Sequence, residues 1–428
     1  MDAYAATRFK EAVRVLGRLR EKGFEAYFAG GYYRDRFLGR EPNDVDVATN
    51  ARPDQVRPLF SRTIPVGEQF GIVIVQLGDE RVEVATFRED EGYEDGRRPT
   101  GIRFTTARED AQRRDFTING VFWDPVDETV HDFIEGRQDL VAGLVRAIGD
   151  PDARFDEDKL RILRAPRFAA RLGFRVEART FEAARRRAAE VAVVSQERVR
   201  DELEKILLDP TRSRGLELVL GLDLGPIVLP GFERDALARS LRVLAALPAR
   251  KLPRTLVWGA LLAGAMSPAS SDSPPPAPSV EAALDALLLR LRLSNADRLG
   301  ALALAREEHL VRAIGALRLA EQKRLLLRED APLLLELARA VALATTGDLE
   351  GVRVARQRRE AFRVEVGPSA LASAPLLKGN DLRDLGLRPG PRFKELLAHA
   401  EEARLEGRAR TREELVELLR VERPELLG

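Results

Sequence analysis

The first 150 residues combine the hydrophobic period of helices with that of strands. Phe9, Val13, Leu16 and Leu19 recur every three or four positions, which predicts an amphipathic helix. Short apolar runs bounded by Gly, Pro or Asp follow and predict buried strands. These runs are AYFAG at 26–30, Val45–Ala48, Gly71–Leu77 and Val82–Phe87. The mixture indicates a head domain of the α+β or α/β class over residues 1–150.

Beyond residue 150 the strand period disappears and the helical period continues. Segments such as EDKLRILRAPRFAARLG and QERVRDELEKILL place arginine on their polar faces, and Pro or Gly marks their ends. A Pro- and Ser-rich stretch at 267–279 is the exception, because its composition cannot bury a core. We predict a disordered loop there and helices elsewhere, the last one beginning near Thr411.

Composition restricts the classes of function only in part. The 70 Lys and Arg residues are balanced by 69 Asp and Glu residues, so the net charge of +1 gives no overall signature of a nucleic-acid binder. The chain has no cysteine, which excludes disulfides, thiolate metal sites and a cysteine nucleophile and is compatible with a reducing cytoplasm. No run is long and apolar enough to predict a signal peptide or a membrane span, so we expect no membrane partner.

Two aspartates on alternate positions of a predicted strand, in NDVDVATN, are the first candidates for chemistry. Side chains at i and i+2 of a strand project from the same face, so we expect the carboxylates of Asp44 and Asp46 to lie side by side. Mg²⁺ would relieve their repulsion, and it is commonly held by one or two carboxylates together with substrate phosphates. The alternative is a solvent-facing edge strand, which is the more common meaning of an isolated D-x-D pair.

A paired glycine shortly before these aspartates favours the magnesium interpretation. Gly30 and Gly31 follow a predicted strand and open the short helical stretch YYRDRFLG. A glycine turn that leads into a helix lets backbone N–H groups approach phosphate oxygens closely, although a glycine pair alone is more often a plain turn. With the aspartates it describes a nucleoside triphosphate site, to which Glu83 on a later strand would add a third carboxylate.

The order of the motifs resembles one known family. FAGGYYRDRFLGREPNDVDVATNARPDQV is followed by VEVATFREDEGYEDGRRP, RRDFTING, EDKLRILRAPRF and ERVRDELEKIL, and GNDLRDLGLRPGP lies near the end. These motifs are similar to those of class II tRNA nucleotidyltransferases and bacterial poly(A) polymerases. The resemblance implies an α+β fold with an N-terminal nucleotidyltransferase head, a mixed sheet with helices, that is catalytic (1–150). It further implies a helical neck for base recognition (151–225), a helical body (226–350) and a helical RNA-binding tail (351–428).

The resemblance also implies a role for each matching residue. Asp44 and Asp46 would hold the metal ions and form the catalytic acidic group with Glu83. Mg²⁺ is the expected cofactor, in a two-metal phosphoryl transfer. The other matches would bind the nucleotide: Gly30, Gly31 and Arg34 at the triphosphate, and Arg113, Arg114, Asp115 and Asn119 of RRDFTIN at the sugar and phosphates.

Asp158 and Arg161 are candidates for base recognition. They lie three residues apart on one face of a predicted helix, so they offer an acceptor and a fork of donors. Cytosine and adenine would present an amino group to Asp158, whereas uracil and guanine present a carbonyl there. A solvated salt bridge is the usual meaning of such a pair. In the similar family, however, this Glu-Asp-x-x-Arg motif serves as an amino-acid template for the incoming base.

Three further features receive weaker predictions. EDEGYEDGRRPTG (89–101) is predicted to be a charged surface loop, and it matches a region that the family uses in choosing between bases. Pro166 lies inside the predicted helix that carries Asp158 and Arg161, and it should kink that helix beyond Asp158. The arginine-rich helices beyond residue 350 would follow an RNA backbone or form a solvated face.

We therefore expect an enzyme, a template-independent RNA nucleotidyltransferase that adds CCA to the tRNA 3′ end from CTP and ATP in the cytoplasm. CC-adding or A-adding enzymes and poly(A) polymerase share the same motifs and stay as alternatives. A catalytically silent RNA-binding protein is the non-enzymatic alternative. The sequence indicates no oligomeric state.

Overall fold

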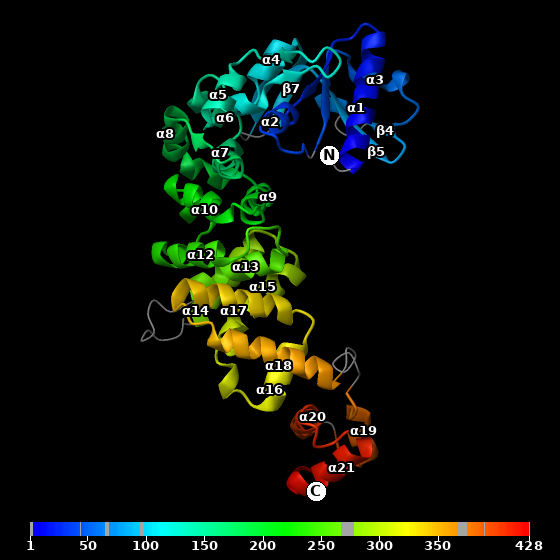
Figure 1. The fold of residues 1–428 in the computed structure, drawn as a ribbon, viewed down its shortest axis with the longest axis vertical. Coiled ribbons are helices and arrows are strands. Elements are labelled where there is room, and N and C mark those ends of the chain that lie inside the picture. The colour runs from blue at the N-terminus through cyan, green and yellow to red at the C-terminus, as the bar shows by residue number, and fades with distance from the viewer. Residues whose placement is uncertain are drawn as a thin grey trace. The chain divides into compact units, whose positions relative to one another are not determined.

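The computed structural model describes residues 3–42, 44–64, 68–94, 98–266, 278–366, 375–388 and 390–427 (Figure 1). The chain divides into two compact units. The first comprises Met1–Phe232 with Arg290–Arg292, and the second comprises Glu233–Leu289 with Leu293–Gly428. The finer division into head, neck, body and tail stays a prediction.

A mixed sheet forms the N-terminal part of the first unit. In spatial order its strands are β3 (Thr63–Ile64), β4 (Ile72–Leu77), β5 (Glu80–Thr86), β2 (Asp46–Thr49), β1 (Ala26–Ala29), β8 (Phe122–Trp123) and β9 (Val130–His131). Neighbouring strands run antiparallel, except for β2 and β5, which run parallel. The four predicted strands correspond to β1, β2, β4 and β5, so the predicted α+β head is confirmed.

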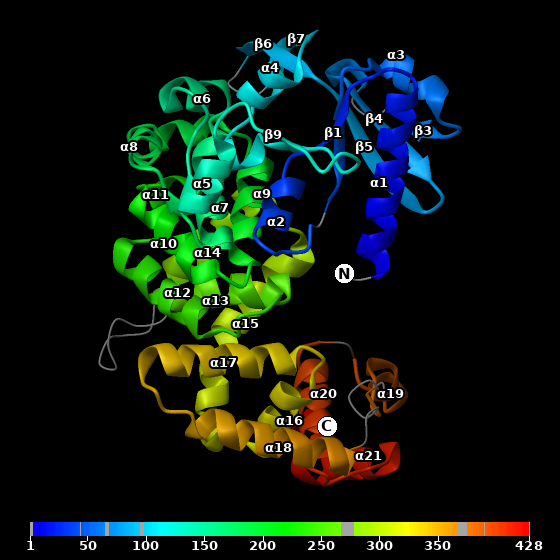
Figure 2. The same cartoon turned by 45° about the horizontal axis from the view of Figure 1, so that its top comes forward.

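Helix α1 (Ala3–Glu21) packs on this sheet (Figure 2). Its apolar residues Val15, Leu16 and Leu19 are fully buried and belong to the same core as Val47 of β2. Burying one such side chain contributes about 1.5–3 kcal/mol. This core therefore fixes β2 and β5, the strands that carry Asp46 and Glu83.

The segment predicted as a charged loop at 89–101 is instead a two-stranded antiparallel hairpin, so that prediction is wrong. The hairpin consists of β6 (Arg88–Glu94) and β7 (Arg98–Phe104), and residues 95–97 lie outside the described ranges. The physical reason lies in the cross-strand pairs: Glu89 faces Arg103, and these side chains form an ion pair. In a sequence, charged residues that pair across two strands cannot be told apart from charged residues on a loop.

Helices dominate the rest of the first unit. They are α2 (Tyr32–Phe37), α3 (Pro53–Val56), α4 (Ala107–Gln112), α5 (Gly136–Ala142), α6 (Pro151–Glu157), α7 (Leu160–Leu172), α8 (Ala178–Arg186), α9 (Gln196–Leu207), α10 (Arg212–Gly221) and α11 (Gly225–Val228). The expectation of helices alone after residue 150 needs one correction, because β11 (Arg175–Val176) pairs in parallel with β10 (Leu144–Val145).

The second unit is helical throughout its described residues. Its helices are α12 (Arg234–Ala246), α13 (Arg254–Met266), α14 (Pro278–Arg290), α15 (Asn295–Arg312), α16 (Leu319–Leu327), α17 (Ala331–Thr345), α18 (Glu350–Val366), α19 (Gly379–Asp384), α20 (Pro391–Leu405), α21 (Arg412–Glu422) and α22 (Pro424–Leu427). Helices α19 to α21 share a small core of their own around Leu396 and Leu419. The predicted disordered insert lies outside the described residues up to 277, and its last two residues begin α14. No described helix of the chain has the length and apolar character of a membrane span.

Candidate active site

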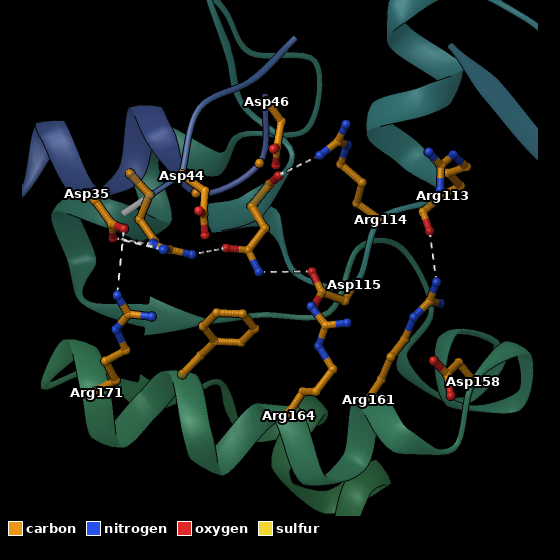
Figure 3. A pocket seen from close by; sticks show the side chains of 15 residues that line it. Asp35, Asp44, Asp46, Arg113, Arg114, Asp115, Asp158, Arg161, Arg164 and Arg171 are labelled. Atoms are coloured by element: carbon orange, nitrogen blue, oxygen red, sulfur yellow. Dashed lines mark hydrogen bonds and ion pairs between the residues drawn. The ribbon is translucent and has the colours of Figure 1, made fainter. Parts of the chain in front are cut away.

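A pocket of about 410 Å³ in the first unit gathers side chains that lie far apart in the sequence (Figure 3). Every predicted site residue except Glu83 lines it: Gly30, Gly31, Arg34, Asp44, Asp46, Arg113, Arg114, Asp115, Asn119, Asp158 and Arg161. Four unpredicted residues also line it: Asp35, Arg164, Phe168 and Arg171. The residues predicted for metal, phosphate and base thus share one site, although their individual roles stay predictions.

The two aspartates enter the pocket from the segment that leads into β2. Asp46 is the first residue of β2, whereas Asp44 precedes the strand, so the prediction that both stand on the strand is wrong for Asp44. Asp44 is exposed, and its Oδ1 accepts a hydrogen bond from Arg8 Nη1 at 3.2 Å. Burial of Asp46, then the charges of Glu83 and Asp44, raise the pKa of Asp46 to about 6. Because these negative charges repel one another, a cation beside them would be stabilised.

Glu83 lies beside Asp46 because β2 and β5 pair in parallel with these two residues in register. Partial desolvation and the charge of Asp44 raise the pKa of Glu83 against the opposing effect of Arg88. Among the described residues, no three acidic or histidine side chains converge closely enough to hold a metal ion by themselves. A cation at Asp44 and Asp46 would therefore complete its coordination with water and phosphate oxygens.

The predicted glycine turn lies directly against these charged groups. Gly30 has a φ of +68°, a left-handed conformation that favours glycine. A Cβ at Gly30 would lie 3.4 Å from Asp46 Oδ2, and a Cβ at Gly31 would lie only 2.6 Å from Arg34 Nη2. The absence of side chains therefore lets Asp46 and Arg34 approach the same backbone turn.

The two arginines of RRDFTIN are anchored by one buried carboxylate. Arg113 Nη2 lies 2.7 Å from Asp110 Oδ1, and Arg114 Nη2 lies 2.9 Å from Asp110 Oδ2. Burial would raise the pKa of Asp110, but the charges of Arg114 and Arg113 outweigh it and lower that pKa. Asp110 stays ionised and keeps both guanidinium groups at the pocket wall.

Asp115 is a second buried carboxylate with several donors. Its Oδ1 accepts hydrogen bonds from Asn119 Nδ2 at 2.9 Å and from the Phe116 N–H at 2.8 Å, and its Oδ2 lies 2.8 Å from Arg164 Nη2. Burial would raise the pKa of Asp115, but Arg164 and the hydrogen bond from Asn119 lower it. An ionised acceptor at this point suits a ribose hydroxyl.

Asp158 and Arg161 do not share one helix, so that prediction is wrong. Helix α6 ends at Glu157, and Asp158 adopts an extended conformation, with φ −145° and ψ 104°, before α7 begins at Leu160. The cause is local, because Asp158 Oδ1 accepts the Leu160 N–H at 3.0 Å. This bond satisfies one of the N–H groups left unpaired at the start of a helix.

Both side chains reach the pocket from this helix break, and each has other partners. Asp158 Oδ2 accepts a hydrogen bond from Arg198 Nη2 at 2.8 Å. Arg161 is buried, and it donates a hydrogen bond to Glu157 Oε2 at 2.6 Å. It also donates to the Arg113 carbonyl at 3.0 Å (Figure 3). The acceptor and the donor fork are therefore held in place separately.

Comparison with known proteins agrees with this arrangement. Residues 26–146 match the family described as the poly A polymerase head domain, and residues 173–235 match the probable RNA and SrmB-binding site of polymerase A. The CCA-adding enzyme of Limosilactobacillus fermentum is 41% identical over 254 residues, which cover 59% of this chain and 62% of that enzyme. The chain is therefore similar, over both matched segments, to the superfamily of tRNA nucleotidyltransferases and bacterial poly(A) polymerases.

Two further members of the superfamily extend the comparison. The CCA-adding enzyme of Staphylococcus aureus is 42% identical over 200 residues, covering 46% of this chain and 50% of that enzyme. The matches with the Limosilactobacillus and Staphylococcus enzymes thus span half to about three fifths of the length of those enzymes. The crystal structure of the Bacillus stearothermophilus CCA-adding enzyme in complex with CTP matches at 28% identity and a TM-score of 0.76, covering 98% of this chain and 99% of that chain. The superfamily fold therefore includes the helical part of the chain.

Nucleotidyltransferases of this superfamily use a divalent metal ion. The residues of this chain fit one, because Asp44 and Asp46 supply the hard carboxylate oxygens that such ions prefer. Burial first, and then the charges of Glu83 and Asp44, raise the pKa of Asp46, so a cation at this point would stabilise its ionised form.

Sequence reasoning missed pocket residues for which a signal exists in part. Arg161, Arg164, Phe168 and Arg171 recur at intervals of three, four and three residues, which is one face of α7. Extending the face from Arg161 would have found the others. Asp35 carries no such signal, because a charged residue next to another in a short helix is unremarkable in a sequence.

Proposed function

We propose that this protein is a template-independent RNA nucleotidyltransferase that completes the CCA end of tRNA from CTP and ATP and releases pyrophosphate. The observation that carries the proposal is the pocket, in which an acidic pair, several guanidinium groups and the side chains of Asp158 and Arg161 meet. Relatives named CCA-adding enzymes, one of them solved with CTP, support it.

Mg²⁺ is the ion that we propose for Asp44 and Asp46, with Glu83 as a neighbouring charge. When bound there, it would activate the primer 3′-hydroxyl and neutralise charge on the leaving pyrophosphate. Asp46, with a pKa of about 6, is mostly ionised at neutral pH and is then ready to act as a ligand. Asp44 is exposed at the same point and offers the second carboxylate.

The arginines of the pocket are proposed to bind the triphosphate. Three of them, Arg34, Arg113 and Arg114, line the pocket from the predicted head, and Arg164 lines it from α7. Guanidinium groups suit phosphate because their donors form a planar fork that binds two oxygens at once. Asp115 and Asn119, which are bonded to each other, are proposed to hold the ribose.

Base selection is proposed for Asp158 and Arg161. An amino group of cytosine or adenine can donate to the Asp158 carboxylate, whereas the carbonyl of uracil or guanine would meet it as a second acceptor. Because Asp158 Oδ2 already accepts from Arg198, a bound base must share or replace that bond. A wrong base would lose the bond without compensation, which is the strongest form of discrimination that a small site has.

The proposal includes the four predicted parts of the chain, with the tail (351–428) binding RNA, and a cytoplasmic location. A chain without cysteine gains nothing from an oxidising compartment, which agrees with that location.

The test offers the protein Mg²⁺ and tRNA transcripts that end before CCA, after the first C and after CC, with CTP and ATP singly and together. We expect C, C and A to be added in that order. Addition of only C or only A would assign a partial enzyme, and long A tails on unrelated RNA would assign a poly(A) polymerase. If the protein extends no RNA, like the Asp44→Ala reference, the enzymatic proposal fails and the silent RNA-binding alternative holds.

A further inference from the structure

Asp35 is a buried carboxylate of the pocket to which the proposed reaction gives no task. It follows Arg34 on α2, and only 7% of its side chain is exposed. Its Oδ1 accepts a hydrogen bond from Arg34 Nε and lies 2.8 Å from Arg34 Nη2. One carboxylate oxygen therefore holds two nitrogens of the same guanidinium group.

The Arg34 guanidinium is held on its other sides as well. Its Nη1 donates to Asn119 Oδ1, and its central carbon lies 5.4 Å from the centre of the Phe168 ring. Gly31 lies next to this guanidinium group and has no Cβ, so the space that a side chain would fill is open to Arg34 Nη2. A side chain with this many contacts has one orientation, whereas an unrestrained arginine has many.

Asp35 is connected in turn to α7. Its Oδ2 lies 4.0 Å from Arg171 Nη2, on the helix face that also carries Arg161 and Phe168 (Figure 3). A cation at this distance lowers the electrostatic cost of holding the Asp35 carboxylate in a buried position. The contacts join α2, which follows the glycine turn, to α7, which carries Arg161.

We propose that Asp35 is a positioning residue, which fixes the guanidinium of Arg34 in the orientation that meets the triphosphate and is itself held by Arg171. The inference rests on the proposed function only in naming the triphosphate as the ligand of Arg34. If Asp35 merely balanced a buried charge, its loss would reduce the amount of folded protein. If it positions Arg34, its loss weakens the binding of phosphate by the protein that is folded.

Asp35→Asn keeps the shape of the side chain and removes its charge. We expect the KM for CTP and the KM for ATP to rise together by about tenfold, because a charge-assisted hydrogen bond becomes a neutral one. The ratio of the two KM values should stay constant, since both substrates carry the same triphosphate. Arg171→Gln should raise both KM values in the same direction and by less.

Asp124→Asn is the matched control. Asp124 is also a buried aspartate of the first unit that pairs with an arginine, Arg20, but it does not line the pocket. This variant should lose stability and keep its KM values. A second measurement needs no RNA and no turnover: inorganic tripolyphosphate should raise the Tm of the wild type and of Asp124→Asn by similar amounts, and that of Asp35→Asn by clearly less.

The results separate this inference from the proposed function. A wild type that adds no nucleotide but is stabilised by tripolyphosphate refutes the proposed reaction, and the Tm shifts still decide the role of Asp35. The inference is overturned by an Asp35→Asn variant with wild-type KM values and Tm shift, by a wild type that tripolyphosphate does not stabilise, or by equal effects in Asp124→Asn. Should Asp35→Asn fail to fold, the KM values of Arg171→Gln decide in its place, and unchanged values refute the inference.

Discussion

Some residues of the pocket carry a charge that destabilises the folded protein, and Asp46 is the main example. Burial, and after it the charges of Glu83 and Asp44, raise the pKa of Asp46, because each disfavours its ionised form. Natural proteins commonly keep such destabilising groups only where function needs them. Removing the charge should therefore stabilise the protein, and this effect gives the first prediction.

Asp46→Asn should be more stable than the wild type by about 1–3 kcal/mol at pH 7 in buffer without divalent cations. The folded state binds the Asp46 proton more tightly than the unfolded chain does, so ionisation costs stability. The stability that the protonated Asp46 gives the fold is therefore complete below the ordinary pKa of 3.8, and it is lost as the pH rises to about 6. Denaturant titrations at pH 4 and pH 7 measure the effect. The advantage of the variant should vanish at pH 4, and an equal difference at both pH values would contradict this explanation.

Gly31→Ala tests the contact between the glycine turn and Arg34. The backbone at Gly31, with φ −81°, accepts alanine, so the new Cβ would act only through Arg34 Nη2 at 2.6 Å. We expect overpacking to cost about 1–3 kcal/mol and the KM for CTP to rise as the guanidinium moves. Gly17→Ala is the control, because a Cβ there meets nothing within 4 Å. Equal KM values for the two variants would show that Arg34 tolerates the displacement.

At the scale of the elements, the break between α6 and α7 is the feature that matters most for base choice. Asp158 accepts the Leu160 N–H at the start of α7 with one oxygen and accepts a hydrogen bond from Arg198 with the other. The same side chain thus stabilises the break between the two helices and is proposed to recognise the base. Its two tasks predict two separable losses.

Asp158→Ala should lower the free energy of unfolding by about 1 kcal/mol through the lost cap and should relax nucleotide choice. Asp158→Ser keeps a capping oxygen and removes the charge, so it should retain most of the stability and still misincorporate. Competition between UTP and CTP on tRNA transcripts measures the choice. An Asp158→Ala variant that still rejects UTP as the wild type does would refute the role of this carboxylate in reading the base.

At the scale of the whole molecule, chemistry and the predicted RNA binding belong to different compact units. The pocket lies in the first unit, and the predicted RNA-binding tail lies in the second. Helices α19 to α21 have their own core, so a defect there need not reach the pocket.

Leu396→Ala tests this separation. Leu396 is fully buried in the core of the tail, and its truncation should destabilise these helices by about 2–5 kcal/mol. We expect the KM for tRNA to rise and the KM for CTP to stay constant in steady-state assays. Leu385→Ala, at a leucine that is 36% exposed, should change neither. A rise in the KM for CTP with Leu396→Ala would show that the tail acts on the nucleotide site.

The sequence predicted the composition of the site better than its local geometry. The glycine pair and the aspartates meet as expected, because hydrophobic periods place strands and their ends reliably, whereas the RRDFTIN residues were expected at the site only through the family resemblance. The helix break at Asp158 was missed because helical periodicity continues across it, and a side-chain cap leaves no trace in hydrophobicity. The β6–β7 hairpin was missed for a related reason, since it pairs through cross-strand contacts such as Glu89 with Arg103 and not through an apolar run.

One helix, α7, carries four residues of the pocket: Arg161, Arg164, Phe168 and Arg171. This restricts the number of residues that the helix can have. One inserted or deleted residue within α7 would rotate everything beyond it by about 100°, which carries the later side chains out of the pocket. Substitutions change one contact at a time, whereas a change of length disables several at once. Active relatives should therefore vary in composition along this helix but keep its number of residues constant.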